Sequence, residues 1–268
     1  MPETRRRPFH RSSQRQVAGR SPDTVWLFGL HAVRDALLNP AREFHRLILT
    51  RNAADRLDEA LAAVDIAPEI SDARKFAAPL DPQSVHQGAA LEVSPLDWGA
   101  LDTVAEQAFA SGSALVALDR VTDPHNVGAI LRSAEVFGAA AVIAPRHHSA
   151  PESGALAKSA SGALERQPYL RVRNLGDALE ALRETGYRII GLDGVGDVEI
   201  ADALRTQDDK PACLVFGAEG PGLRARTREL CDGLARISAS GAFGSLNVSN
   251  AAAVALYQTS INGRPPVE

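Results

Sequence analysis

The second half of this 268-residue chain alternates short apolar runs with helical patterns, and few folds accommodate that order. The runs lie at 114–118, 141–144, 188–192 and 212–216, and the helical patterns at 126–137, 174–186 and 223–232. Apolar strands alternating with helices predict an α/β domain whose parallel sheet is covered on both faces. Because such sheets bind ligands beyond the carboxyl ends of their strands, we look for a site in the loops after Leu118, Phe216 and Ile237.

A smaller α/β unit precedes this domain, and its order is expected to begin near Trp26. The predicted elements are a helix at 31–38, a strand at 46–50, a helix at 53–64 and a strand at 89–93. We therefore divide the chain into a disordered basic tail (1–22), a small domain (23–96), a linker with a connecting helix (97–112) and a larger domain (113–268).

Charge is unevenly distributed along the chain. Residues 1–20 hold six arginines and one glutamate, a charge of +5, whereas the whole chain carries −4, which leaves −9 for the rest. A basic tail on an acidic body can contact the phosphates of a nucleic acid. It can equally be a disordered segment that only aids solubility, and the sequence leaves both interpretations open.

Composition excludes several classes of protein. No stretch approaches the roughly 20 apolar residues of a membrane helix, and no apolar run follows the N-terminal arginines as a secretory signal requires. Cys213 and Cys231 are too few for a disulfide framework or a zinc site, and Cys213 is predicted to be a buried thiol in an apolar strand. We expect a cytoplasmic protein with no metal site.

The first candidate segment runs from Leu118 to Ala134, where a strand, a polar loop and a helix follow one another. Core residues at helical spacing place Arg132 about 150° from the centre of the apolar stripe, so it points away from the domain's core. Arg132 is either a solvated helix residue or a group that faces RNA phosphate or ribose. Asn126 is either a helix cap or first-turn residue, or a polar group offered to a substrate.

The second candidate segment, Leu214–Leu223, is a strand that runs into three glycines, Gly217, Gly220 and Gly222. Their spacing fits neither the dinucleotide fingerprint nor a phosphate loop, and Glu219 would repel a pyrophosphate. A carboxylate beside glycines suits a ligand with hydroxyl groups or positive charge, and S-adenosylmethionine qualifies. The alternative is a tight turn with a surface glutamate.

The third candidate segment, Ile237–Asn250, is a loop of small residues that leads into an alanine-rich helix. Ser245 or Asn247 could cap that helix. The alanines allow close backbone packing, which fits a chain end enclosed by another element. For each polar residue of this loop, helix capping is the alternative to a role in ligand binding.

Together the three segments resemble the signature motifs of the SpoU/TrmH branch of the SPOUT RNA methyltransferases. The motifs, D-P-x-N-x-G-A-I-x-R-S-A, G-x-E-G-x-G and S-L-N-V-S, start at Asp123, Gly217 and Ser245. The resemblance extends from about Ala114 to Asn262, and Lys158–Ala163 also fits. Residues 27–93 resemble the family's substrate-binding domain, which is akin to certain ribosomal proteins and includes a His-Gln-Gly phrase in its last part.

This resemblance implies a parallel-sheet domain with a deep trefoil knot, a small ribosomal-protein-like RNA-binding domain, and a homodimer. It implies that S-adenosylmethionine lies bent in the knot, in contact with Gly217, Ala218, Ile237, Ser245 and Leu246. It implies a reaction in which a ribose 2′-hydroxyl attacks the sulfonium methyl group. Around the reacting groups we expect four residues: Arg132, Asn126, Glu219 and Asn247.

The family's proposal gives Arg132 the role of general base. Because arginine is effectively always protonated, positioning a phosphate is the physically easier role. The layout favours a guanosine of 23S rRNA as the substrate, with no DNA or membrane partner. The alternatives are a tRNA 2′-O-methyltransferase and a non-catalytic RNA-binding or ribosome assembly factor. Two positions depart from the usual pattern, Ser238 in place of proline and Asn250 in place of an apolar residue.

Overall fold

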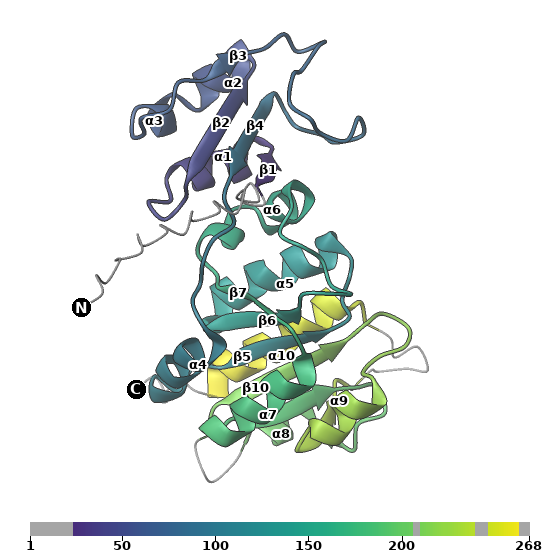
Figure 1. The fold of residues 1–268 in the computed structure, drawn as a ribbon. Helices are drawn as coiled ribbons and strands as arrows, with labels where there is room; N and C mark the ends of the chain where they lie inside the picture. Colours follow the sequence, from purple (N-terminus) through teal and green to yellow (C-terminus); the bar gives the residue numbers. More distant parts are fainter. Residues whose placement is uncertain (1–23, 206–209, 239–245, 263–268) are drawn as a thin grey trace, which may run out of the picture.

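The computed structural model of the protein describes residues 24–205, 210–238 and 246–262. The predicted basic tail and Ser245 lie outside these residues. The chain forms a small α/β unit above a larger one in the view of Figure 1. In the part of the chain that the structure describes, no helix is both long and apolar enough to cross a membrane.

The small unit is a sheet with the strand order β1-β4-β2-β3, in which β4 runs antiparallel to both β1 and β2. The predicted strand at 89–93 is confirmed with its bounds. The helix expected at 53–64 is two short helices, because Leu57 leaves helical geometry (φ −108°, ψ 11°) and buries its side chain. The elements are β1 (Val25–Phe28), α1 (Leu30–Leu37), β2 (Phe44–Leu49), α2 (Arg51–Arg56), α3 (Asp58–Leu61), β3 (Glu69–Ile70) and β4 (Ala89–Val93).

The large unit is a parallel sheet with the strand order β7-β6-β5-β10-β8-β11-β9. All four predicted strands are present. The strands are β5 (Leu115–Asp119), β6 (Ala141–Pro145), β7 (Tyr169–Val172), β8 (Arg188–Leu192), β9 (Val198–Glu199), β10 (Ala212–Gly217) and β11 (Gly233–Arg236). The helices are α4 (Leu101–Ala110), α5 (Pro124–Phe137), α6 (Gly154–Ala160), α7 (Leu175–Thr185), α8 (Ile200–Leu204), α9 (Ala225–Leu230) and α10 (Val248–Asn262), with a 3₁₀ turn, η1 (Ala163–Glu165).

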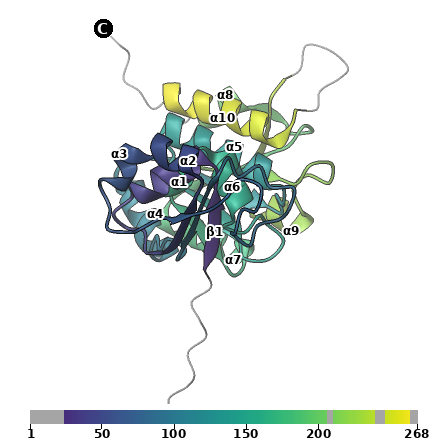
Figure 2. The ribbon, with the colours of Figure 1, turned by 90° about the horizontal axis from the view of Figure 1, so that it is seen from above.

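Helices cover both faces of this sheet, as predicted. Alternate residues of each strand point to opposite faces, so Val116 and Leu214 pack with α5, α6 and α10, whereas Leu115 and Val215 pack with α4, α7 and α9. Figure 2 shows α8 and α10 on one side of the molecule and α7 on the other. Cys213 is buried among the second set, and burial raises the pKa of its thiol.

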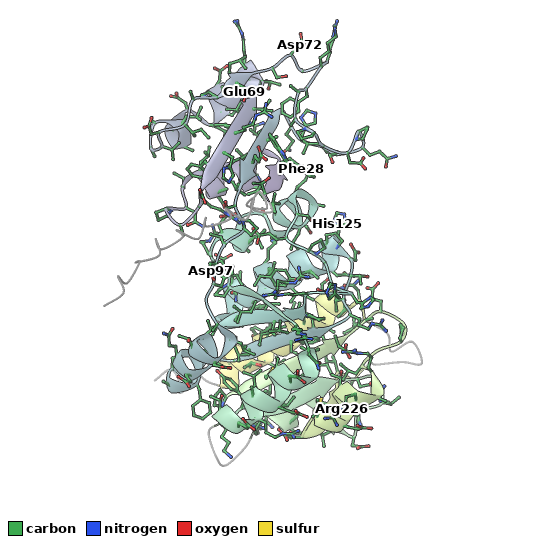
Figure 3. The ribbon with its side chains drawn as sticks, viewed as in Figure 1. Phe28, Glu69, Asp72, Asp97, His125 and Arg226 are labelled. Carbon is green, nitrogen blue, oxygen red and sulfur yellow. The ribbon has the colours of Figure 1, made fainter. Side chains whose placement is uncertain are left out.

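The two units meet where α6 lies against β1 and α1. At Gly154 the backbone approaches Phe28 so closely that an added Cβ would lie 2.3 Å from the Phe28 ring, and Figure 3 shows Phe28 at this junction. Beside it, the buried Arg42 guanidinium binds both carboxylate oxygens of Glu165 at 2.8 and 2.9 Å. Its Nη1 donates to the Ser94 carbonyl and lies 2.8 Å from a carboxylate oxygen of Glu152.

Candidate active site

Three segments far apart in the sequence meet at Asn247, just before α10. The Asn247 side-chain Nδ2 donates to Asn126 Oδ1, 2.9 Å away at the start of α5, and to Glu219 Oε1 in the loop after β10. Asn126 is buried, whereas Glu219 and Asn247 are exposed. One polar residue from each of the three candidate segments therefore joins a single hydrogen-bonded group.

Asn247 also caps α10, because its Oδ1 accepts hydrogen bonds from the backbone N–H of Ser249 (2.9 Å) and from the Ser249 hydroxyl (2.6 Å). Asn126 is not a cap. The cap is Asp123, whose carboxylate accepts a 2.9 Å hydrogen bond from the His125 backbone N–H. Pro124 occupies the first position of the helix, where proline is favoured. The Asn126 amide is therefore available to Asn247.

The loop after β10 folds back on itself beside this group. The Gly222 backbone N–H donates to the Ala218 carbonyl at 2.9 Å, and a Cβ added to Gly217 would lie 2.2 Å from the Gly222 carbonyl carbon. Gly220 has a φ of +81°, which glycine adopts without steric cost. Glycines at these points therefore let the loop close tightly.

Asp119, fully buried at the end of β5, fixes the far end of that loop. Its two carboxylate oxygens accept from the Arg224 backbone N–H at 3.0 Å and from Arg224 Nε at 2.7 Å. Since β5 and β10 are neighbours, with Gly217 opposite Asp119, the loop is tied at both ends to the carboxyl edge of the sheet.

A pocket of about 450 Å³ opens along this edge, beyond the ends of β8, β10 and β11. Its lining includes the apolar side chains of Leu192, Phe216 and Val248, and Glu219. Four of the five positions that the resemblance assigned to cofactor contact line it: Gly217, Ala218, Ile237 and Leu246. The fifth, Ser245, is outside the described residues.

Arg132 lies elsewhere on α5. Arg132 is six positions after Asn126, which places it about 9 Å further along the helix axis and about 120° around it. Its side chain is exposed, as its spacing predicted, and it is not among the residues that line the pocket. The structure therefore brings three of the four expected catalytic residues together and leaves Arg132 apart from them.

Sequence reasoning missed one side of the pocket, formed by Asp193 and Gly194 after β8 and by Arg228 on α9. Asp193 and Arg228 form an ion pair there. The available signal was the end of the predicted strand at 188–192, because an Asp-Gly pair directly follows it at the same edge of the sheet.

Ser238, at one of the two positions that depart from the family pattern, anchors the chain after β11. Its backbone N–H donates to Glu199 Oε2 at 3.2 Å, and its hydroxyl donates to Oε1. These hydrogen bonds, with the neighbouring Arg236, lower the pKa of the Glu199 carboxyl. A proline here would lack the N–H, so the serine adds a contact that the usual residue cannot make.

Two family models match this chain. Residues 26–98 match the family described as RNA 2′-O ribose methyltransferase substrate binding, and residues 113–257 match the SpoU rRNA Methylase family. The chain belongs to the SpoU rRNA methylase family. The two matched regions correspond to the small and the large unit of the structure.

Relatives within the SpoU family align over nearly the whole chain. The chain is 38% identical over 249 residues to the 23S rRNA (guanosine-2′-O-)-methyltransferase RlmB of Pseudomonas aeruginosa, covering 90% of this chain and 98% of the relative. It is 38% identical over 240 residues to RlmB of Photobacterium profundum, covering 87% and 95%.

A solved structure of the family has the same fold. The SpoU methyltransferase AviRb from Streptomyces viridochromogenes, solved in complex with its cofactor AdoMet, superimposes with a TM-score of 0.74. It is 25% identical in sequence, and the match covers 89% of this chain and 90% of that chain.

Proposed function

We propose that this protein transfers the methyl group of S-adenosylmethionine to the ribose 2′-hydroxyl of a guanosine in 23S rRNA. The observation that carries the proposal is the meeting of Asn126 and Asn247 with Glu219, which lines a glycine-rich pocket. The RlmB names of relatives that align over most of the chain favour ribosomal RNA over tRNA. The intact polar group counts against a non-catalytic assembly factor.

The pocket suits S-adenosylmethionine in size and in chemistry. A volume of about 450 Å³ lies within the range of small-molecule sites. Gly217, Ala218 and Ile237 would hold the cofactor largely by backbone and apolar contact, and Glu219 places negative charge where a sulfonium or ammonium group would benefit. When bound, the cofactor supplies an activated methyl group.

With the methyl donor already activated, the protein's own task is to hold the ribose in line and to accept its proton. Asn247 fixes the orientation of the Glu219 carboxylate and of the Asn126 amide through one side-chain NH₂ group. Both partners keep acceptor capacity for ribose hydroxyls. We assign Asn126 and Asn247 to substrate positioning, and Glu219 as the group best suited to accept the proton that the 2′-hydroxyl loses.

Arg132 requires a different explanation, because it stands away from this group. Val136, one helical turn further on the same face of α5, is 74% exposed. On the adjacent α10, Val254, Tyr257 and Ile261 are also exposed, and Tyr257 packs edge-on against Phe137 of α5. We propose that this apolar surface is the interface of a homodimer, since exposed apolar patches mark association sites, and that Arg132 serves the partner's active site there.

Three further features belong to this proposal. The C-terminal segment, with the alanine-rich helix α10, would thread through a loop to form the deep trefoil knot that the family resemblance implies. The small unit, residues 23–96, is the RNA-binding domain, and 113–268 is the catalytic domain joined to it by 97–112. The enzyme acts in the cytoplasm, where its ribosomal substrate would be found.

Methyl transfer is tested with the full chain, radiolabelled S-adenosylmethionine, and unmodified transcripts of 23S rRNA and of tRNA. We expect label in a single guanosine of the 23S transcript. The matching experiment maps 2′-O-methyl marks on ribosomal RNA from a strain that lacks the protein, where one mark should be missing. Label in tRNA alone would overturn the ribosomal assignment, and failure to bind the cofactor in a calorimetric titration would favour the assembly factor.

A further inference from the structure

A second cavity, of about 310 Å³, opens at the carboxyl edge of the large sheet beyond β5, β6 and β7. Its lining includes three arginines and two histidines: Arg120, His147, His148, Arg173 and Arg224. None of its lining residues, all in the described part of the chain, is acidic. This concentration of cationic and hydrogen-bond-donating groups stands out on a body whose sequence is acidic overall.

Two of the arginines lack a neutralising partner within residues 24–205, 210–238 and 246–262. Among the described residues, the side chains of Arg120 and Arg173 make no hydrogen bond or ion pair. Arg224 is held by Asp119 through Nε. Like charges gathered without partners repel one another, so the arrangement favours an anion that binds between them.

The loops that carry these residues are fixed by hydrogen bonds. The Arg171 guanidinium donates to the carbonyls of Pro145, Arg146 and Ala150, and these contacts hold the loop that presents His147 and His148. The Ala150 backbone N–H in turn donates to the Val121 carbonyl at 3.3 Å, which ties this loop to the one that carries Arg120. Arg120 itself has a left-handed backbone (φ +63°), which is uncommon for a residue other than glycine.

The cavity adjoins the proposed active site. Gly222 lines the cofactor pocket and Arg224, two residues later, lines the basic cavity. We infer that the basic cavity binds a backbone phosphate of the RNA strand, next to the nucleotide whose ribose enters the active site. Arginine forks bind phosphate oxygens in pairs, and contacts of this kind fix the register of a strand without reading its bases. The inference rests on the proposed function.

The test measures binding of an unmodified 23S rRNA transcript, without cofactor, to the full chain as the salt concentration varies. Arg120→Gly keeps the left-handed backbone conformation at position 120 accessible. Arg173→Ala removes a side chain that has no partner among the described residues, so no buried group loses a hydrogen bond. The matched control is Arg205→Ala. Arg205 is exposed and directly follows α8. Arg188, the first residue of β8, donates hydrogen bonds to the last carbonyls of α8. Arg205 therefore lies toward the amino edge of the sheet, opposite the edge that carries the basic cavity.

We expect the double variant Arg120→Gly/Arg173→Ala to bind RNA about tenfold more weakly, a loss of about 1.4 kcal/mol. The slope of log K against log [salt] should fall by about 0.7 for one single-stranded phosphate. Cofactor affinity should stay unchanged, and Arg205→Ala should match the wild type. RNA binding and slope equal to those of the control would overturn the inference.

A second titration with inorganic phosphate distinguishes the source of the anion. Phosphate binding that the double variant abolishes, with RNA affinity untouched, would mean a free-anion site and would overturn the RNA assignment. Failure of methyl transfer is a separate result, because the binding comparison needs no turnover. A wild type that binds the cofactor and methylates RNA, with double-variant RNA binding equal to the control, would overturn the phosphate site alone.

Discussion

Two polar clusters join distant segments of this protein, and they are built in opposite ways. The junction cluster (Arg42, Glu152, Glu165) lies between the small and large units, with Arg42 and Glu165 buried and Glu152 half-buried. Arg42 has partners on Nε, Nη1 and Nη2. The proposed active-site cluster (Asn126, Glu219, Asn247) contributes Glu219 to the lining of the pocket of about 450 Å³, and two of its three members are exposed.

This difference separates groups that stabilise the fold from groups that can meet a substrate. In the junction cluster, desolvation by burial tends to lower the pKa of Arg42, but the bonds from Glu165 and Glu152 outweigh it and raise the pKa overall. In the active-site cluster, the carboxylate and the amide oxygens keep lone pairs for a ligand. We therefore expect changes in the first cluster to alter stability and changes in the second to alter catalysis.

The largest expected effect is on stability, from Arg42→Ala. Removing the arginine leaves the Glu165 carboxylate buried without its ion partner, and loss of one member of a buried pair costs about 3–5 kcal/mol. Urea unfolding measures the change. Arg46→Ala, which breaks the exposed pair with Glu69, is the matched control and should leave the unfolding free energy nearly unaltered. Equal effects of the two variants would contradict the assignment of the junction cluster.

The next largest effect is on catalysis, from Asn247→Asp. Aspartate keeps the oxygen that caps α10 but loses the Nδ2 donor to Asn126 and Glu219, and it sets a second negative charge beside Glu219. We expect kcat to fall about 100-fold because the ribose is misplaced, while urea unfolding stays close to wild type. Ser249→Ala removes one bond to the same asparagine and should retain most activity. A large loss of stability in Asn247→Asp would place this residue with the junction cluster.

The active-site cluster also predicts a dependence on the partner subunit, since Arg132 is not beside it. Arg132→Ala and Asn247→Asp should each retain about 1% of wild-type activity or less. If Arg132 acts across a two-fold interface, co-refolding the two variants gives mixed dimers with one intact site, and about a quarter of wild-type activity should return. An arginine that serves its own subunit predicts no recovery. Light scattering on the wild type checks the dimer itself.

The sequence predicted the strand positions well where most residues of a strand are buried. The expected runs at 89–93 and 188–192 match β4 and β8 with both ends correct. β9 and β11 escaped notice because they are short and partly exposed, so their residues lack a clear apolar pattern. Leu57, buried by a break between two helices, shows core packing prevailing over helical periodicity.

At the site, spacing alone left the roles of the polar residues ambiguous, and only the three motifs taken together predicted that these residues share one site. Asn126, Glu219 and Asn247 were each equally explicable as caps or turn residues until the three motifs were considered together. Asp193 was missed because β8 sits between β10 and β11 in space although it precedes both in the chain. Likewise, nothing near Arg42 indicates a partner 123 residues away.

The smallest effect tests the junction cluster through Glu152. Burial is the main cause that raises the pKa of the Glu152 carboxyl, and Arg42 offsets only part of it. Because the folded protein holds this proton more tightly than the unfolded chain does, ionisation of Glu152 works against folding. That penalty is absent below about pH 4, the ordinary range of a glutamate, and it appears as pH rises through the raised pKa.

Glu152→Gln mimics the protonated form at every pH and can still bond to Arg42. At about pH 7 we expect the variant to be more stable than the wild type by less than about 1 kcal/mol, the scale of one hydrogen bond. Near pH 4, where the wild-type carboxyl is itself protonated, the two proteins should unfold at the same urea concentration. A variant less stable than the wild type at pH 7 would mean that the attraction of Arg42 exceeds the cost of burying Glu152. The junction cluster would then depend on both carboxylates, not on Glu165 alone.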